Sequence, residues 1–211
     1  MNYSYVIYTA PAALIAIVLH EMAHGFVSYK LGDPTPKYDG RLSLNPMNHL
    51  DFMGTICLIF LRFGWAKPVR INSGYYKNRR TGVMMTAIAG PLMNYILAFI
   101  GVFGYVLMVK LTGGYFGPVT NYLFNFFRYF AMINVGLGTF NLIPIPPLDG
   151  SKILSLLIHG DENYTMRNVN RYGYIVLAAL AITGVLSIPM VFAENVVINF
   201  YMMIVRFILR I

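Results

Sequence analysis

Two histidines and a glutamate near the start of the chain have the spacing of a hydrolytic metal centre. They lie in the segment His20-Glu21-Met22-Ala23-His24. On a helix, residues four apart project from one face, one turn above the other, so both imidazoles can bind the same metal ion. The glutamate between them is placed to act on a water molecule at that metal. The pattern therefore predicts a metal site, provided that a helix carries it.

The residues that carry this motif are expected to form a membrane-spanning helix over residues 5–29. Residues 10–19 contain no charged side chain, and the segment exceeds the roughly 20 apolar residues that a bilayer requires. Ionisable groups at such a position are costly unless they have a partner. A metal ion within a protein cavity would offset that cost. The placement therefore favours a metal site over two unrelated surface histidines.

The composition indicates an integral membrane protein with a single domain. The 211 residues are 57% hydrophobic and only 11% charged, whereas a soluble domain has about 25% charged residues. The net charge is +8, and most lysines and arginines lie in short loops beside apolar segments, as in membrane proteins. The sequence has no basic face and no base-stacking motif, so a nucleic-acid partner is not expected. Cys57 is the only cysteine, so neither a disulfide nor a cysteine metal site is expected. The N-terminus lacks the basic region of a cleaved signal peptide.

The hydrophobic pattern predicts an all-α polytopic membrane protein with about four full transmembrane helices. These are expected at residues 5–29, 81–110, 119–142 and 172–191, the last interrupted near Pro189. Residues 50–63 are apolar but too short for a full crossing, so a re-entrant or partial segment is expected there. Alternation near Pro68 permits a small β-hairpin over 64–75. Short helices are expected at 151–159 and, at the C-terminus, over 196–211.

The distribution of basic residues predicts the orientation in the membrane. Lys and Arg are absent before the first span and from the turn at 112–118, but they occur in 30–41, 67–80, 152–171 and at the C-terminus. If residues 50–63 dip in and return, all the basic stretches lie on the cytoplasmic side and the N-terminus lies outside. At about 1.5 Å per helical residue, His24 and His20 would then lie roughly 9 and 15 Å below the cytoplasmic boundary near Lys30.

A catalytic zinc ion commonly takes three protein ligands, and Asp149 is the best candidate for the third. It follows a break at Pro144, Pro146 and Pro147, and such breaks in membrane helices occur where the backbone is buried in protein or lines a cavity. Four other acidic residues are expected to be solvated in turn-rich segments: Asp33, Asp39, Asp161 and Glu162. Asp51 and His49, which flank the short apolar segment, are weaker candidates for contact with the site. Arg128, inside the third span, is expected to extend towards the interface.

Several motifs together resemble the site-2 protease family of intramembrane zinc metalloproteases, peptidase family M50. The first motif, His20 to His24, is followed by Gly40-Arg41-Leu42-Ser43-Leu44-Asn45-Pro46 and by Gly64-Trp65-Ala66-Lys67-Pro68-Val69. Further along are Ala89-Gly90-Pro91-Leu92-Met93-Asn94 and the second motif, from Asn141 to Asp149-Gly150. The resemblance lies within residues 5–156; the C-terminal helices at 172–211 contribute little to it. Residues 1–211 have no room for a PDZ or CBS domain, so the chain resembles the minimal form of the family.

The resemblance implies one Zn²⁺ ion bound by His20, His24 and Asp149, with Glu21 as the general base. It also implies that Asn141 positions the substrate or stabilises the oxyanion. The expected activity is that of a zinc metalloendopeptidase in the cell membrane, with its site towards the cytoplasm and a transmembrane protein, most simply a single-pass one, as substrate. A homodimer remains open. The alternative is a proteolytically inactive metal-binding protein or metal carrier, although Glu21 is present and only one metal cluster is visible.

Overall fold

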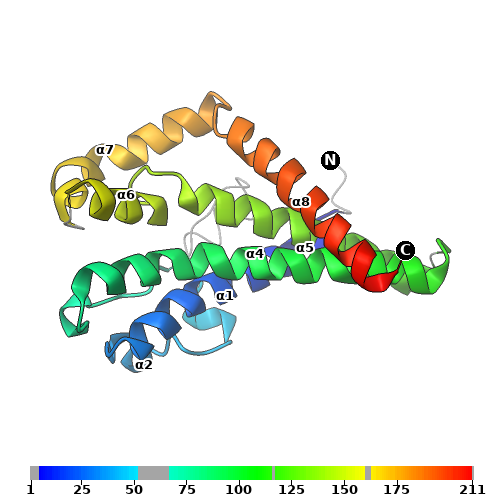
Figure 1. Cartoon of the computed structure of the whole chain (residues 1–211), viewed down its shortest axis with the longest axis horizontal. Coiled ribbons are helices and arrows are strands. Elements are labelled where there is room, and N and C mark those ends of the chain that lie inside the picture. Colours follow the sequence, from blue (N-terminus) through cyan, green and yellow to red (C-terminus); the bar gives the residue numbers. More distant parts are fainter. Residues whose placement is uncertain (1–4, 52–66, 116, 160–162, 211) are drawn as a thin grey trace. The chain divides into compact units, whose positions relative to one another are not determined.

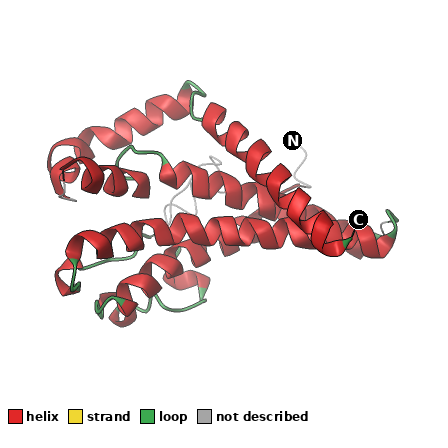
Figure 2. Cartoon of the chain, in the orientation of Figure 1, coloured by secondary structure: helices red, strands yellow, loops and turns green. Residues whose placement is uncertain are grey.

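The computed structural model describes residues 5–51, 67–115, 117–159 and 163–210, and the regular elements in this part of the chain are helices joined by loops (Figure 1). The long helices are α1 (Val6–Lys30), α4 (Arg79–Thr112), α5 (Pro118–Leu142), α7 (Asn163–Ile182) and α8 (Ser187–Leu209), and the shorter elements are α2 (Thr35–Tyr38), α6 (Asp149–His159) and the 3-10 turns η2 (Pro46–Asn48) and η3 (Ser73–Tyr75). Figure 2 shows only helices and loops in these ranges. The predicted all-α class is confirmed.

Three helices are long and apolar enough to cross a bilayer: α1, α4 and α8. Their most apolar windows have mean hydropathies of 1.7, 2.1 and 1.7, and only 6% of the α8 window is buried within the protein. Such exposure of apolar side chains is normal for a helix whose solvent is lipid. The chain is therefore a multi-pass membrane protein. Helix α5 has 25 residues but is not among the three candidates, so a count of four spans stays a prediction.

The C-terminal region differs from the sequence prediction. The expected span at 172–191 ends earlier, because α7 stops at Ile182 and the chain turns at Gly184, which has a positive φ of 73°. The expected short helix at 196–211 is instead a 23-residue helix that begins at Ser187. Pro189 interrupts neither element, since it lies in the first turn of α8, where its missing N–H would have no helical partner.

The predicted hairpin is not found in the part of 64–75 that is described. Residues 67–72 have no regular secondary structure, and 73–75 form η3. Arg41 is buried and donates to the Lys67 carbonyl at 3.1 Å and to the Pro68 carbonyl at 3.3 Å, while the Lys67 amide donates to the His49 carbonyl. The segment 67–72 is therefore fixed at its start by its neighbours. The partial segment expected at 50–63 lies almost entirely outside the described residues.

The chain divides into two compact units. Unit 1 contains residues 1–16, 94–141 and 177–211, and unit 2 contains residues 17–93 and 142–176. In unit 1, Val102, Val106, Ala131 and Val205 form a buried cluster. Two fully buried asparagines also join α4 to α5, because Asn94 Nδ2 donates to Asn134 Oδ1 at 2.9 Å. Interhelical hydrogen bonds of this kind hold membrane helices together without a hydrophobic driving force.

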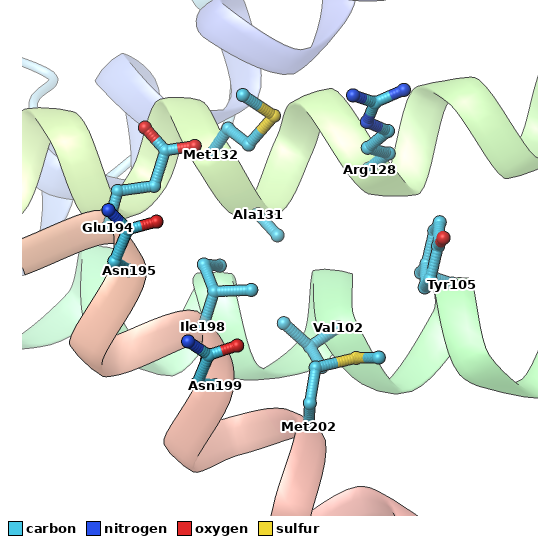
Figure 3. Close-up of a pocket in the computed structure, with 10 residues that line it drawn as sticks. All are labelled: Val102, Tyr105, Arg128, Ala131, Met132, Glu194, Asn195, Ile198, Asn199 and Met202. Atoms are coloured by element: carbon cyan, nitrogen blue, oxygen red, sulfur yellow. The ribbon is translucent and has the colours of Figure 1, made fainter. Parts of the chain in front are cut away.

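Unit 1 also contains a cavity of about 300 Å³ with polar side chains on apolar helices (Figure 3). Arg128 extends from α5, and Glu194, Asn195 and Asn199 extend from α8. Apolar residues such as Val102 and Met202 complete the lining. Among the described residues, Arg128 and Glu194 make no ion pair with each other. The cavity is thus a second, separate concentration of polar groups.

Candidate metal centre

Three potential metal ligands converge in unit 2. The Nε2 atoms of His20 and His24 are 3.0 Å apart, and Asp149 Oδ2 lies 3.4 Å from His20 Nε2 and 3.0 Å from His24 Nε2. All three residues are buried, with exposed fractions of 5, 5 and 7%. Within the described residues they form the one group of three or more such side chains that could hold a metal ion. The structure thus brings together the three residues expected from the sequence.

Helix geometry and the proline break explain this convergence. His20 and His24 lie on consecutive turns of α1, with their rings edge to face at a centroid distance of 4.7 Å. The prolines end the preceding helical path, and α6 then begins at Asp149. The N-terminus of a helix favours a negative charge, so a carboxylate is well placed there. Gly150 permits the tight entry, because a Cβ on it would lie only 2.1 Å from the Leu142 carbonyl oxygen.

The surrounding contacts orient the ligands. His24 Nδ1 lies 2.7 Å from the Thr86 carbonyl oxygen. A carbonyl only accepts, so Nδ1 carries the proton and the Nε2 of a neutral His24 presents a lone pair to the centre. Lys152 Nζ lies 3.2 Å from Asp149 Oδ1, which leaves Oδ2 facing the two histidines. Such outer contacts fix the tautomer and orientation of metal-binding side chains.

Electrostatics favour an ionised aspartate at this position. Burial raises the pKa of the Asp149 carboxyl, but the two histidines, when protonated at Nε2, and the charge of Lys152 outweigh it. The net result is a pKa well below the usual range for aspartate. A bound metal ion would take the place of those Nε2 protons as the positive partner of Asp149. Asp149 therefore supplies a negative charge that partly neutralises a divalent cation bound otherwise by two neutral imidazoles.

The donor set and its spacing fit zinc. Ligand atoms bound to one tetrahedral zinc ion at about 2.0–2.1 Å are roughly 3.3 Å apart, and the three observed separations lie between 3.0 and 3.4 Å. Gly90 of α4 keeps this space open. A Cβ at that position would lie 2.3 Å from His24 Nε2 and 2.6 Å from His20 Nε2. The helix therefore approaches the histidine nitrogens closely only because Gly90 has no side chain.

Glu21 is held beside this group by a backbone contact. Its Oε2 accepts a hydrogen bond from the Val69 amide at 3.1 Å. Val69 and His24 both line a cavity of about 360 Å³, whose wall also contains Thr86, Arg79 and Lys152. A carboxylate, three convergent ligands and an adjoining cavity can together bind a metal ion and a small part of a substrate.

The remaining predicted residues have different positions. Asn141 is in the last turn of α5, in unit 1, and its amide donates to the Leu137 carbonyl at 3.0 Å; its predicted role stays a prediction. Asp39 is exposed, as expected. The expectation of a solvated Asp33 is wrong, because its exposed fraction is 0%. The contacts that bury it come from residues distant in sequence, so local turn chemistry gave no signal of them. Asp161 and Glu162 lie outside the described residues.

Sequence comparisons agree with this arrangement. A sequence model of peptidase family M50 matches residues 108–184. The chain is 40% identical over 176 residues to YwhC of Bacillus subtilis, an alignment that covers 83% of this chain and 80% of that protein. It is 26% identical over 180 residues to Rip2 of Mycolicibacterium smegmatis, covering 82% of this chain and 66% of that protein. Both relatives are named "putative zinc metalloprotease". No solved structure matches the chain.

The chain therefore belongs to peptidase family M50. It is a zinc metallopeptidase of the multi-pass membrane class.

Proposed function

We propose that the protein is an intramembrane zinc endopeptidase that cleaves peptide bonds within or near the transmembrane helices of other membrane proteins. The observation that carries this proposal is the position of the site: His20, Glu21 and His24 belong to α1, a 25-residue helix apolar enough to span a bilayer. His20 is ten residues from the end of α1 at Lys30, or roughly 15 Å at about 1.5 Å per residue. Chemistry at that depth acts on a substrate that is itself in the membrane.

In this proposal, His20, His24 and Asp149 hold the zinc ion, and Glu21 transfers protons. Bound zinc supplies Lewis acidity for the attacking water and for the carbonyl of the scissile bond. Glu21, which the Val69 amide holds through Oε2, takes a proton from the attacking water and returns it to the leaving amine. Thr86 and Lys152 keep His24 and Asp149 in their binding orientations. Asn141 is proposed to position the substrate or stabilise the oxyanion.

The proposed substrate is a transmembrane helix, most simply that of a single-pass protein. A helix satisfies its backbone hydrogen bonds internally, so it must unwind locally before cleavage. Residues 67–71 are proposed to receive the unwound segment as an added strand. Among the described residues, the Arg70 and Ile71 amides have no hydrogen-bond acceptor, whereas the Val69 amide is bound to Glu21. Within the described part of the chain, this segment therefore has backbone groups available for a substrate.

The distribution of basic loops supports a proposed orientation in which the site faces the cytoplasm and the N-terminus lies outside. A carrier function has less support. A metal path requires several successive groups of ligands, and one group is present among the described residues.

The test is cleavage of a model transmembrane substrate by the purified, zinc-loaded protein in liposomes, compared with Glu21→Gln. We expect wild type to cleave, and Glu21→Gln to bind zinc normally but to lose at least about 100-fold in kcat, since general acid–base catalysis contributes roughly 10²–10⁴-fold. Glu194→Gln, which neutralises an acid outside the site, is the matched control and should cleave like wild type. Equal cleavage by wild type and Glu21→Gln would disprove the proposed mechanism. Failure of zinc-loaded wild type on a broad substrate panel would disprove the function.

A further inference from the structure

Asp33 is a buried carboxylate that the proposed mechanism does not use. Its Oδ1 accepts from the Thr35 amide at 2.9 Å, and its Oδ2 accepts from Ser28 Oγ and from the Asn72 amide, each at 2.8 Å. Burial raises the pKa of this carboxyl, but the hydrogen bonds from Asn72, Thr35 and Ser28 outweigh it and lower the pKa. An ionised carboxylate is buried only where donors compensate for lost water. These donors come from three separate segments of unit 2.

One arm of contacts leads from Asp33 to the metal centre. Ser28 Oγ lies 2.7 Å from Tyr76 Oη, and Tyr76 Oη lies 3.1 Å from Thr86 Oγ1. The carbonyl of the same Thr86 accepts from His24 Nδ1 at 2.7 Å. Every residue of this arm is buried, with exposed fractions of 0% for Ser28, 7% for Tyr76 and 3% for Thr86. The arm thus fixes the residue that orients a zinc ligand.

Each hydroxyl group in this chain of contacts has one proton, and this determines which group donates in each hydrogen bond. Ser28 has a single hydroxyl proton and donates it to Asp33, so Tyr76 must donate to Ser28. The Tyr76 proton is then donated to Ser28, so Tyr76 Oη can only accept from Thr86. Thr86 Oγ1 therefore shares its proton between Tyr76 Oη and the Gly82 carbonyl oxygen, which lies at 2.8 Å. The ionised acceptor at Asp33 therefore orders all three hydroxyl groups.

A second arm leads from Asp33 to the proposed base. The Asn72 amide is bound to Asp33 and the Val69 amide to Glu21, so two carboxylates hold one segment at positions three residues apart. This is the segment proposed to receive the substrate. Displacement of Asn72 would change the angle at which the Val69 amide meets Glu21. Asp33 is thus linked to both the metal-binding and the proton-transferring side of the site.

We propose that Asp33 is a positioning residue of the hydrolytic site, which orients the His24 imidazole through Ser28, Tyr76 and Thr86 and holds residues 69–72 against Glu21 through Asn72. This inference rests on the proposed function for its catalytic consequence, but its first arm concerns zinc binding alone. Asp33 itself touches neither metal nor substrate. A purely structural alternative is that Asp33 only anchors α2 through Thr35.

The variants Tyr76→Phe and Asp33→Asn separate these possibilities. Tyr76→Phe removes one hydroxyl from the first arm and leaves Thr35 untouched. Asp33→Asn retains Oδ1 for Thr35, but an amide NH₂ in the place of Oδ2 accepts from neither Ser28 nor Asn72. Tyr95→Phe is the matched control, because Tyr95 Oη also bonds a threonine hydroxyl, Thr139 Oγ1 at 2.9 Å, but outside this network.

The main readouts are zinc affinity, by competition with a chromophoric chelator, and the visible spectrum of the Co²⁺-substituted full-length protein. Loss of a contact made directly to a metal ligand typically weakens metal binding about 10–100-fold, and the lower end applies here because Tyr76 and Asp33 act through Thr86. We expect about a 10-fold loss with Tyr76→Phe and Asp33→Asn, together with a shifted Co²⁺ spectrum, and less than a twofold change with Tyr95→Phe. At saturating zinc, Tyr76→Phe should recover wild-type kcat, whereas Asp33→Asn should retain a raised KM for the membrane substrate.

A second pair of variants keeps the test decisive if Tyr76→Phe fails to fold. Thr86→Val removes the hydroxyl at nearly constant volume, and Thr86→Ser retains it; we expect zinc affinity to fall only with Thr86→Val. Wild-type zinc affinity and Co²⁺ spectra in Tyr76→Phe and Thr86→Val, even with a lower thermal midpoint, would leave Asp33 a structural role only and overturn the inference. Absence of proteolysis in wild type would contradict the proposed function but would not alter these metal readouts.

Discussion

The metal centre of unit 2 and the polar cavity of unit 1 both place ionisable groups on apolar helices, but they differ in how those groups are partnered. Asp149 contacts His20, His24 and Lys152, and His24 is fixed further by Thr86. In the cavity, Arg128 and Glu194 have no hydrogen bond or ion pair with any described residue (Figure 3). The first group is preorganised, and the second is not.

This difference separates two uses of polar groups in a membrane. Ionisable side chains within spans are costly and usually mark a functional pathway or a partner. A hydrolytic site must hold its ligands in one geometry before the substrate arrives, because orientation supplies much of the catalysis. The metal centre meets that requirement, whereas the two charges in the cavity have no fixing contact within the described residues. Substitutions of polar groups should therefore have large effects at the metal centre and small effects at these two charges.

The largest effect is expected from Asp149→Asn, which removes the negative charge from the metal centre. Loss of an outer-shell contact already costs about 10–100-fold in metal affinity, so loss of a ligand charge should weaken zinc binding by more than about 100-fold. Titration against a competing chelator measures the zinc affinity of the variant. Asp39→Asn, at an exposed position, is the control. Unchanged zinc affinity in Asp149→Asn would show that the metal is held elsewhere.

Gly90→Ala should separate metal binding from stability. Alanine favours a helix over glycine by about 1 kcal/mol, but its Cβ would lie 2.3 Å from His24 Nε2. We expect at least about a 10-fold loss of zinc affinity without a matching loss of thermal stability. Gly136→Ala on α5 is the matched control, because its nearest neighbour would be Met190 Cε at 3.5 Å, an ordinary contact. Equal zinc affinity in the two variants would contradict the close approach of α4.

Within unit 1, a partnered and an unpartnered polar residue should respond differently. Asn94→Ala removes the donor to Asn134 and leaves a buried acceptor unsatisfied, which costs about 1–3 kcal/mol. Glu194→Gln removes a charge that has no partner among the described residues, so it should not lower the midpoint of thermal unfolding in detergent. If Glu194→Gln lowered the thermal midpoint as much as Asn94→Ala, Glu194 would have a stabilising partner in the folded protein, which would contradict this prediction.

The sequence predicted those parts of the site that depend on local geometry. The spacing of His20 and His24 follows from one helical period, and Asp149 follows a proline break that is visible in the chain. Glu21 lies between the histidines, so its place near the metal is fixed by the same helix. The membrane class followed from composition, because long apolar segments and few charges have no stable alternative in water.

Features set by distant contacts were missed. Asp33 lies between Gly32 and Pro34, a pattern typical of a solvated turn, yet its partner Asn72 is 39 residues away. Its burial follows from tertiary hydrogen bonds that no local pattern indicates. Pro189 was interpreted as an interruption, whereas the turn at Gly184 and a proline in the first turn of α8 produce one long helix. Proline is tolerated in the first turn of a helix but breaks or kinks the helix in its interior.

The smallest expected effect is the dependence of stability on pH that Asp33 contributes. Its pKa in the folded protein is lowered from 3.8, so the unfolded chain binds the proton more tightly. The stabilisation from Asp33 is then fully present above pH 3.8 and is lost as the pH falls through the lower folded-state pKa. In metal-free protein, the thermal midpoints of wild type and Asp33→Asn should differ by a few degrees near about pH 5, and the difference should shrink as the pH falls below 3.8 towards the folded-state pKa. Metal-free protein is required, because protonation of the zinc ligands would otherwise dominate both curves. A constant difference across this range would show that the Asp33 carboxylate is not preferentially ionised in the fold, and so could not order the hydroxyl groups between it and His24.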